Sequence, residues 1–476
     1  MNEIVQEGQG EWAKGWPIVF SSLIGVALCL SPLPYWALIV IGQELVDEFG
    51  WTRSITSAGF LFMTAGVLVG APVVGRLVDR YGARKVLLPS ILVLGIGTAL
   101  FSQMTNNPIV FYTIFFVTAL LGSATLPITW SKAIVNNFDK YRGLALGVAL
   151  TGTGLFGFIA TPTIQALIDA FGWRMAYVCV GLLPIIISFP LAFFLFHDKK
   201  EARALAKLDV TTLPSLKSWI WQPLVLAAAL FTSMIFVIKQ FGPFYVVLLM
   251  MAVLALYLAY GYKSAERSDT SSTLPGLSLK QAYLDYRFWL ILLVMMLLGG
   301  VISGIIANAK FMLLDKGYSA KEATDFFTGA GVIALSVLVG RLVGGFLVDH
   351  IWAPLIAFIF LSVPAIGCYI LMQDMSVSMN VLAMILVGFA AGVEFDLIAY
   401  FISRYFGMRS YGQIYGLIYA AFGLGSGTSP VIFNLIRGDD PDYSRVLFYA
   451  AIGFIIGATM CLFLGKYRSF GESHHG

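Results

Sequence analysis

Long apolar runs, separated by short polar stretches, fill almost the whole chain. A helix that crosses a bilayer needs about 20 mostly apolar residues. By this criterion the pattern predicts fourteen spans. They cover residues 17–43, 54–76, 85–104, 109–135, 143–168, 174–196, 219–238, 241–262, 287–313, 323–348, 352–373, 379–403, 412–436 and 444–465. The sequence therefore predicts an all-α membrane protein that crosses the bilayer many times.

The two longest polar stretches, 197–217 and 263–286, flank a hairpin of two apolar runs at 219–262. Without this hairpin, six spans precede and six follow. We therefore expect a six-helix bundle at 1–196, linkers that flank the hairpin at 197–286, and a second six-helix bundle at 287–476. The low charge of the hairpin favours a passive brace, while a dimer contact and an evolutionary remnant remain open.

The two six-span halves carry an internal repeat. Gly70, Gly75 and Asp79 recur 270 residues later as Gly340, Gly345 and Asp349, and Gly143, Gly147 and Gly154 recur 269 residues later as Gly412, Gly416 and Gly423. A nearly constant offset at six positions indicates a duplicated unit. Two parallel six-helix repeats around a central cavity are typical of transporters that work by alternating access.

Composition and charge agree with this class. The chain is 59% hydrophobic and only 12% charged, about half the charge of a soluble domain. The net charge of +4 comes without a basic stripe, which argues against nucleic-acid binding. Of 30 Lys and Arg residues, 22 lie near one set of span ends, seven near the other and Lys310 inside a span. The positive-inside rule therefore predicts cytoplasmic termini in a plasma membrane, expected to be a bacterial inner membrane.

Two carboxylates stand near the centre of the span at 379–403. A charge at this depth costs several kcal/mol, so each needs a partner, a proton or a cavity. Glu394 and Asp396 are two positions apart, about 200° around a helix, and cannot share a face. Asp396, Tyr400 and Arg404 form one polar stripe. We expect one of the two acids to bind protons or contact a solute; the alternative is a hydrogen-bond lock between helices.

Other polar and aromatic residues inside the spans are candidates for the same cavity. Ser31-Pro32-Leu33-Pro34 interrupts the first span, because proline lacks a backbone donor. Broken helices often line transport sites. The further candidates for solute or proton binding are Tyr35, Trp130, Lys132, Thr153, Asn308 and Lys310. Each also has a structural explanation: packing, topology or, for Lys310, extension of the side chain to the interface.

The second predicted span is followed by Gly75-Arg76-Leu77-Val78-Asp79-Arg80-Tyr81-Gly82-Ala83-Arg84-Lys85. Glycine permits close helix approach, and an aspartate can face a helix N-terminus or a basic neighbour. Such a cluster could hold the two halves together, or could serve only topology and folding. The expected gating residues are Gly75, Asp79, Arg80, Arg84, Arg142, Asp349 and Arg404.

The segment 75–85 resembles the loop motif of the major facilitator superfamily, and the resemblance covers nearly the whole chain apart from the hairpin. It implies a major facilitator fold of two six-helix repeats with an inserted two-helix hairpin, about 14 transmembrane helices.

Within that superfamily the chain is most similar to the monocarboxylate-transporter-like branch, which includes oxalate/formate exchangers. The matching stretches are 142–147, 169–174, 287–289, 340–354 and 394–407. The resemblance implies proton-linked movement of small carboxylates. The branch's animal members carry an acid and an arginine one turn apart in the eighth core span, where this chain has no charge between Asp325 and Arg341.

Together these features predict a secondary active transporter that moves a small organic anion with protons. A proton/drug antiporter for cationic or amphipathic compounds is the alternative. No nucleophile–base pair, metal cluster or phosphate-binding glycine loop is visible, so we expect no enzyme activity, cofactor or metal. We expect the monomer to be functional, and the solute, the direction of transport and the proton stoichiometry are left open.

Overall fold

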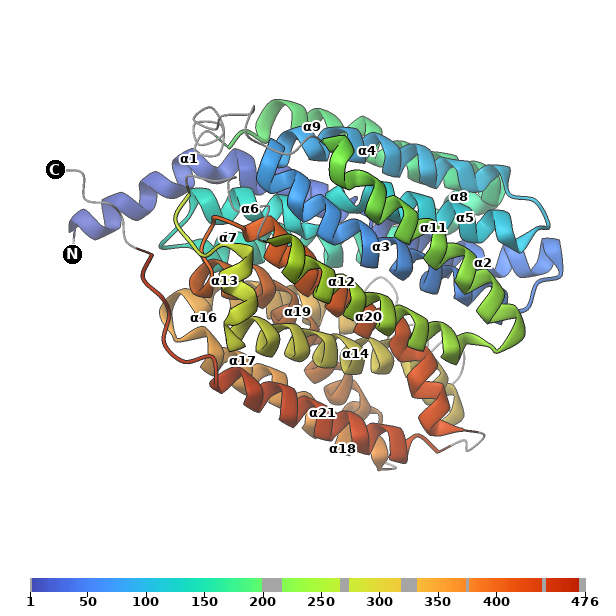
Figure 1. Cartoon of the computed structure of the whole chain (residues 1–476). Helices are drawn as coiled ribbons and strands as arrows, with labels where there is room; N and C mark the ends of the chain where they lie inside the picture. The colour runs from blue at the N-terminus through green and yellow to red at the C-terminus, as the bar shows by residue number, and fades with distance from the viewer. Residues whose placement is uncertain are drawn as a thin grey trace.

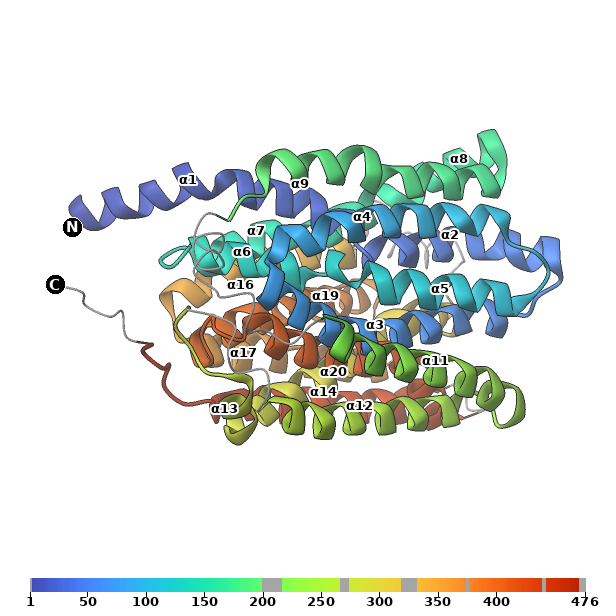
Figure 2. The ribbon, with the colours of Figure 1, turned by 45° about the horizontal axis from the view of Figure 1, so that its top comes forward.

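The structure is a computed structural model that describes residues 2–198, 216–265, 274–317, 332–373, 376–438 and 442–470. In these residues the chain is helical, with an isolated β-bridge between Gly276 and Gly407. The helices run side by side along one direction (Figures 1 and 2), and both termini lie at the same end. We call this the terminal end. We call the opposite end, where helix α2 (Pro32–Phe49) ends, the distal end.

The first half of the chain builds the first group of helices. They are α1 (Asn2–Ala27), α2 (Pro32–Phe49), α3 (Arg53–Tyr81), α4 (Ala83–Leu100), α5 (Pro108–Gly122), α6 (Pro127–Asn137), α7 (Arg142–Leu150), α8 (Gly152–Leu183) and α9 (Phe189–Leu195). Short 3₁₀ turns follow α4 and α5, and a π-helical turn, Pro184–Ser188, precedes α9. Together they form the half that carries Asp79.

The first predicted span is broken, as its prolines indicate. Residues 28–31 are non-helical between α1 and α2, and Pro32 and Pro34 stand at the start of α2, where no intrahelical donor is needed. The freed amide of Leu30 donates instead to the Thr125 hydroxyl at 3.1 Å. A side chain of another span therefore satisfies the backbone at the break.

The chain reverses direction within the helical stretch Arg142–Leu195. The break lies at Gly172, whose φ of 77° is accessible to glycine and avoided by other residues. Two residues further on, Arg174 reaches Glu48 at the end of α2 with an N–O distance of 2.7 Å, and the Trp173 indole also donates to Glu48. The stretch 169–174 thus ties α2 and α8 together at the distal end.

The inserted hairpin consists of α11 (Leu216–Gln240) and α12 (Pro243–Ala265). In α11, the Phe231 ring packs on Phe62 of α3 and Phe116 of α5, with centroids 5.6 and 5.1 Å apart. The other helix, α12, contacts α20 in the second half of the chain. The hairpin therefore lies over the line where α3 meets α20, and it contacts both halves (Figure 1).

The second half of the chain builds the remaining helices. They are α13 (Leu279–Leu284), α14 (Tyr286–Asp315), α16 (Val332–His350), α17 (Ala353–Ser362), α18 (Pro364–Met372), α19 (Val377–Tyr405), α20 (Tyr411–Arg437) and α21 (Ser444–Leu462). The predicted span 323–348 begins outside the described residues, since its first nine residues are not among them.

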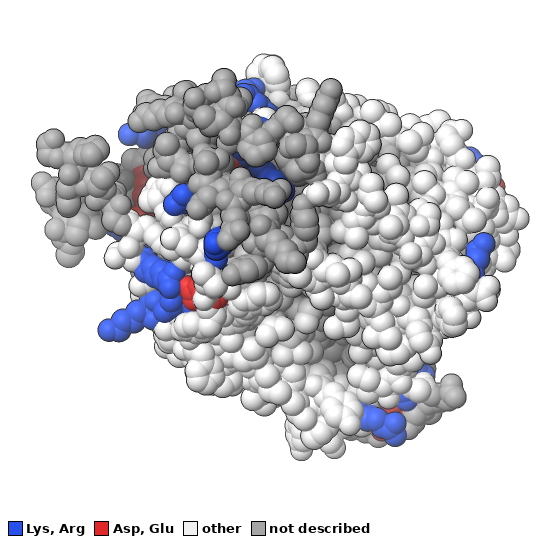
Figure 3. Space-filling model, in the orientation of Figure 1, with Lys and Arg blue, Asp and Glu red and all other residues white. Residues whose placement is uncertain are grey.

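Eleven helices among the described residues are long and apolar enough to cross a membrane, and Pro243–Ala259 and Val332–Val348 are shorter apolar helices. One of the eleven is Arg142–Leu195, which Gly172 divides. In Figure 3 the charged side chains gather toward the ends of the molecule and leave the middle of this face uncharged. The all-helical membrane fold is confirmed, and the number of fourteen spans stays a prediction.

Candidate functional site

A buried ion pair lies where the two halves meet. Arg341 of α16 is 4% exposed and donates to Asp396 Oδ1 of α19 at 3.4 Å. The same nitrogen donates to the carbonyl oxygen of Leu150, at the end of α7, at 2.7 Å. The guanidinium also lies 5.0 Å from the centre of the Phe395 ring. Arg341 therefore joins an acid of its own half to the backbone of the other half.

Polar atoms of this ion pair remain without hydrogen bonds. Asp396 Oδ2 and Arg341 Nε are buried and have no partner among the described residues. The 3.4 Å distance is also longer than the roughly 2.7–2.9 Å of a strong charge-assisted hydrogen bond. Buried charges are costly unless they are fully paired. The pair therefore has unused capacity for a proton or for an anionic ligand.

Aromatic side chains of α19 and α20 surround this region. Tyr419 packs on Tyr415 and on Phe395, with ring centroids 6.0 and 5.9 Å apart. The Tyr415 hydroxyl is buried and has no hydrogen-bond partner among the described residues. Thr153, a predicted site residue, donates to the Leu150 carbonyl that also accepts from Arg341. Thr153 is therefore part of the same region.

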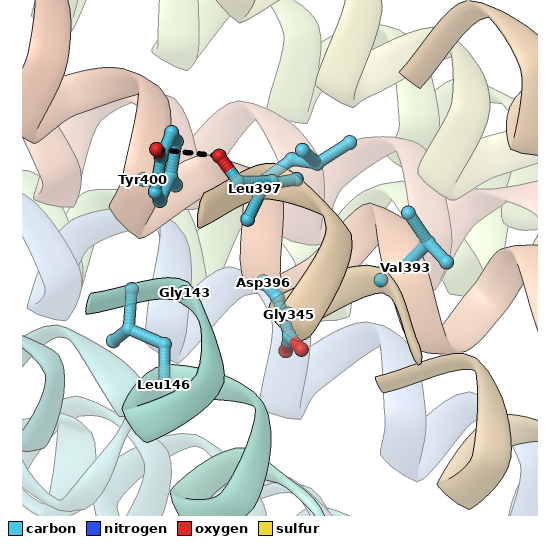
Figure 4. A pocket seen from close by; sticks show the side chains of 9 residues that line it. Gly143, Leu146, Gly345, Val393, Asp396, Leu397 and Tyr400 are labelled. Atoms are coloured by element: carbon cyan, nitrogen blue, oxygen red, sulfur yellow. Dashed lines mark hydrogen bonds between the residues drawn. The ribbon is translucent and has the colours of Figure 1, made fainter. Parts of the chain in front are cut away.

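A small pocket opens beside Asp396 (Figure 4). It is a narrow space between α7, α16 and α19. Tyr400 lines it and donates its hydroxyl to the carbonyl of Val348 at 2.7 Å. The Asp396 carboxylate points away from Leu397 and Tyr400 in this view. The pocket is thus a crevice between the halves that ends near the ion pair.

Glu394 faces another part of the molecule, as the helical geometry predicted. Its side chain is buried among helices of the second half, and Oε1 has no hydrogen-bond partner among the described residues. Gly299 of α14 lies beside it, since a Cβ built there would be 3.5 Å from Oε1. The two central acids therefore have different surroundings: Asp396 has a cation beside it, and Glu394 lies against packed helices.

Toward the terminal end, Asp79 of α3 holds the other half of the chain. Its two oxygens accept from the backbone amides of Gly412 and Gln413, both at 2.9 Å, at the start of α20. Lys132 donates to Asp79 at 3.0 Å and to the carbonyl of Val78 at 3.2 Å. A carboxylate is favourable at a helix N-terminus, where backbone donors and the helix dipole point at it. We call this the Asp79 latch.

The internal repeat produces a second contact of the same kind. Asp349 of α16 accepts from the amides of Gly143 and Leu144, at 2.7 and 2.9 Å, at the start of α7. We call this the Asp349 latch. In each latch, an aspartate of one half binds a helix N-terminus of the other half. This geometry accounts for the repeated aspartate and glycine positions.

Glycines allow the halves to approach closely at both latches. A Cβ at Gly75 would lie 2.1 Å from the carbonyl oxygen of Gly412, and one at Gly143 would lie 2.4 Å from that of Gly345. Real Cβ atoms do not come so near to backbone, so larger residues here would force the helices apart. The terminal end is therefore closed by backbone contact.

A third group of contacts crosses the halves near the surface. Arg142 donates to the Ser403 hydroxyl of α19 at 3.3 Å and pairs with Asp139 at 3.1 Å. Arg404 of α19 reaches the same Asp139 at 3.6 Å. Gly75, Asp79, Arg142, Asp349 and Arg404, all predicted gating residues, thus lie in or beside contacts between the halves.

Two predicted gating residues lie elsewhere. Arg80 stacks on Tyr81, 5.2 Å from the ring centre, and Arg84 donates to the carbonyl of Phe193, so these contacts, made between described residues, lie within the first half. Lys132, a predicted solute contact, pairs with Asp79 rather than with Asp396. A long side chain near the inner end of a span can reach either place, so sequence position did not decide between them.

The remaining predicted site residues are not brought to the ion pair by any contact described here. Trp130 donates to the carbonyl of Thr125 at 2.9 Å inside the first half. Tyr35 packs on Phe60, with centroids 5.1 Å apart. Asn308 donates to the carbonyl of Gly304, one turn earlier, at 2.9 Å. The side chain of Lys310 lies outside the described residues.

Arg341 is the functional candidate that the sequence interpretation missed. It is one of the 22 Lys and Arg residues that the sequence places near the cytoplasmic span ends, and the structure corrects this placement because its side chain is buried and paired. The sequence signal was an arginine inside an apolar, glycine-rich run. Its acid partner lies 55 residues further on, in a different helix, and only the fold brings the two together.

Comparison with known proteins identifies the family. The sequence profile of the Major Facilitator Superfamily matches residues 24–261 and 225–430. These matches cover most of the chain, which therefore belongs to this superfamily of membrane transporters. The helical membrane fold, the internal repeat and the latches between the halves agree with this assignment.

Within the superfamily the chain is monocarboxylate-transporter-like. It is 32% identical over 177 residues to monocarboxylate transporter 14 of Mus musculus, a match that covers 37% of this chain and 33% of that relative. It thus spans about a third of the length of the first curated relatives it matches. Monocarboxylate transporter 9 of Gallus gallus is 22% identical over 501 residues, which cover 95% of this chain and 92% of that protein.

A solved structure shows the same fold. The human organic anion transporter MFSD10 (TETRAN) superposes with a TM-score of 0.65 at 14% identity, covering 94% of this chain and 99% of that one. The protein is thus a multi-pass membrane protein of the Major Facilitator Superfamily, and its named relatives are transporters rather than enzymes.

Proposed function

We propose that this protein moves a small organic anion, recognised through a carboxylate, together with protons. The main support is the buried contact of Arg341 with both Asp396 and the Leu150 carbonyl of the other half. A guanidinium binds a carboxylate through two parallel hydrogen bonds, which gives both strength and orientation. An anion bound by Arg341 would touch both halves, as alternating access requires.

Proton coupling follows from competition for Arg341. While Asp396 is ionised, it neutralises Arg341 and occupies one side of the guanidinium. A proton on Asp396 removes that charge and leaves Arg341 available to an anionic solute. Proton and solute then bind together, because the site carries an excess charge when only one of them is present and none when both are bound or both are absent. Symport is the expected result.

The two halves of the chain, 1–196 and 287–476, are the proposed moving units, with 197–286 between them. The distribution of Lys and Arg supports a cytoplasmic location for the terminal end. With both latches formed, the solute would then reach the site from the other side of the membrane. Opening toward the cytoplasm requires that the latches at Asp79 and Asp349 break. We propose that the monomer carries out this cycle.

The test uses purified protein in liposomes that contain a pH-sensitive dye. Mono-, di- and aromatic carboxylates are added outside, with protein-free liposomes as the baseline. We expect at least one acid to acidify the lumen in the presence of the protein. Asp396→Asn should abolish solute-driven proton movement, because asparagine cannot take up the proton.

Glu394→Gln is the matched control, since it removes a second buried acid from the same helix. We expect it to keep the coupling, because Arg341 pairs with Asp396. Loss of coupling in Glu394→Gln alone would move the proton site to Glu394. Full coupling in both single variants would contradict the assignment to either acid.

The names of the relatives do not favour the drug-antiporter alternative. It nevertheless has a clear signature in the same liposomes. If no carboxylate acidifies the lumen, and a cationic dye causes protons to be released, the protein is a proton/drug antiporter rather than an organic-anion symporter.

A further inference from the structure

The segment that leads into the first span contacts the loop before α7. Glu11 of α1 accepts from three consecutive backbone amides, those of Asp139, Lys140 and Tyr141, at 3.2, 3.3 and 3.4 Å. A run of backbone amides that converge on one carboxylate is an anion-binding arrangement. The side chain of Glu11 thus holds the loop at its turn.

Packing reinforces this contact. Trp12 meets the Phe138 ring edge-on, with centroids 5.2 Å apart. Gly15 lies against the same ring, since a Cβ there would approach it to 2.4 Å. The beginning of α1 is therefore fitted to the loop at 138–141, and it places that loop in one position.

The same loop supports the contacts between the halves. Its end is the start of α7, where Gly143 and Leu144 bind Asp349 of the other half. It also carries Asp139, which Arg404 reaches from the other half. Glu11 therefore lies directly behind the Asp349 latch, and the contacts that the structure describes for its side chain are all with the first half.

The second half of the chain shows a corresponding arrangement. Before α14, the amide of Leu277 donates to the carbonyl of Phe406 at 2.7 Å, and the amide of Met408 donates to the carbonyl of Pro275 at 2.8 Å. The loop held in this way precedes α20, whose first amides bind Asp79. In both halves, the chain that leads into the first helix supports the loop that forms a latch.

We propose that these two segments are braces that set the strength of the latches, and that Glu11 is the adjustable one. The second brace consists of main-chain hydrogen bonds, which side-chain substitution leaves in place. The first depends on one carboxylate. Loss of Glu11 should free the loop, weaken the Asp349 latch and shift the protein toward states that are open at the terminal end. The inference rests on alternating access in the proposed function, and it requires neither the solute nor the proton.

The experiment measures opening at the terminal end directly. Leu146 of α7 is buried and lines the crevice between the halves. In a background without the native cysteines, Leu146→Cys is a reporter that a water-soluble maleimide reaches only when the halves separate. Labelling rates are compared in nanodiscs with and without Glu11→Ala. We expect about five-fold faster labelling in Glu11→Ala, in line with the loss of charge-assisted hydrogen bonds.

Two controls make the result specific. Asp47→Ala removes an exposed carboxylate from α2 at the distal end, where it accepts only a local hydrogen bond from Gln43 among the contacts described, and it should leave the rate unchanged. A second background keeps only Cys368, which is buried within the second half, to detect unfolding.

An unchanged rate in Glu11→Ala would overturn the proposal. Equal increases at Leu146→Cys and at Cys368 would also overturn it, because they would show that Glu11 maintains the fold rather than the latch. Faster labelling at Leu146→Cys alone would support it, whether or not the liposome assay finds a transported acid.

Discussion

Arg341 is a buried cation whose hydrogen bonding is incomplete. It is almost completely buried, yet its polar atoms are only partly satisfied by Asp396 and the Leu150 carbonyl. A guanidinium in such a place is costly unless something further binds it in the working cycle. This is the physical reason for treating it as the anion-binding residue.

A charge-conserving substitution tests this role. We expect Arg341→Lys to lower solute uptake by at least about ten-fold, because an ammonium group cannot form the bidentate contact of a guanidinium with a carboxylate. The loss should appear mainly as weaker apparent affinity, since the charge is kept. Uptake kinetics in liposomes measure both quantities. Wild-type affinity in Arg341→Lys would show that Arg341 only balances Asp396.

Single residues also show the limits of reading a sequence. Glu394 and Asp396 could be separated by helical geometry alone, because neighbouring positions in one helix have a known angle. The partners of Lys132 and Arg341 could not be derived in this way. Each partner belongs to another helix, and nothing local in the sequence specifies which helices become neighbours.

The two latches are built from the same pair of elements, an aspartate near the end of one helix and the N-terminus of another. They differ in one respect. Asp79 also binds the buried Lys132, whereas the contacts described for Asp349 are backbone amides. The internal symmetry of the fold is therefore not matched by symmetry of charge.

This difference predicts unequal effects of substitution. Asp79→Asn removes the negative partner of a buried lysine, a change that typically costs about 3–5 kcal/mol. Asp349→Asn weakens two hydrogen bonds to a helix N-terminus, worth about 1–2 kcal/mol. We expect the thermal midpoint of the purified protein to fall more in Asp79→Asn. Adding Lys132→Met to Asp79→Asn should recover part of the loss; equal midpoints for the two single variants would contradict this explanation.

The sequence was most informative about the positions of the helices and of the breaks between them. Apolar runs located the helices, because a bilayer requires about 20 apolar residues for each crossing. Prolines located the break between α1 and α2. The two spans predicted on either side of Gly172 are two helical segments in the structure, and they meet at a turn whose positive φ suits glycine.

Considered as a whole, the molecule is closed at the terminal end and is held there by backbone contacts between α3 and α20 and between α7 and α16. The crevice in Figure 4 is a narrow space between the two halves, lined by residues of both. Transport requires that this end open and close again, so residues that prevent closure should change the whole cycle.

Gly75→Ala is the corresponding test. Its Cβ would lie 2.1 Å from the Gly412 oxygen, so we expect the terminal end to stay open and uptake to fall to near background. The matched control is Gly423→Ala, a repeated glycine where a Cβ would be 3.7 Å from Val67, an ordinary contact. Maleimide labelling at Leu146→Cys should rise in the first variant and not in the second. Normal uptake in Gly75→Ala would refute the steric argument.

The repeated glycines and aspartates predicted the type of contact that forms each latch. Two copies of one unit must meet through equivalent surfaces, and small residues beside an acid suit a close contact with a helix end. Their partners at Gly412 and Gly143 belong to the other half of the chain in each case. Arg80 and Arg84 share the same motif, yet the contacts that the structure describes for them lie within the first half.

The amino-acid pattern alone was sufficient for the membrane class, the repeat, the helices and the separate directions of Glu394 and Asp396. These properties depend on solvent and on local helical geometry, which act on residues close together in the chain. The Arg341–Asp396 pair, the place of Lys132 in the Asp79 latch and the contact of Glu11 with the loop before α7 required the folded molecule. They join residues far apart in sequence, and such contacts depend on which helices pack together.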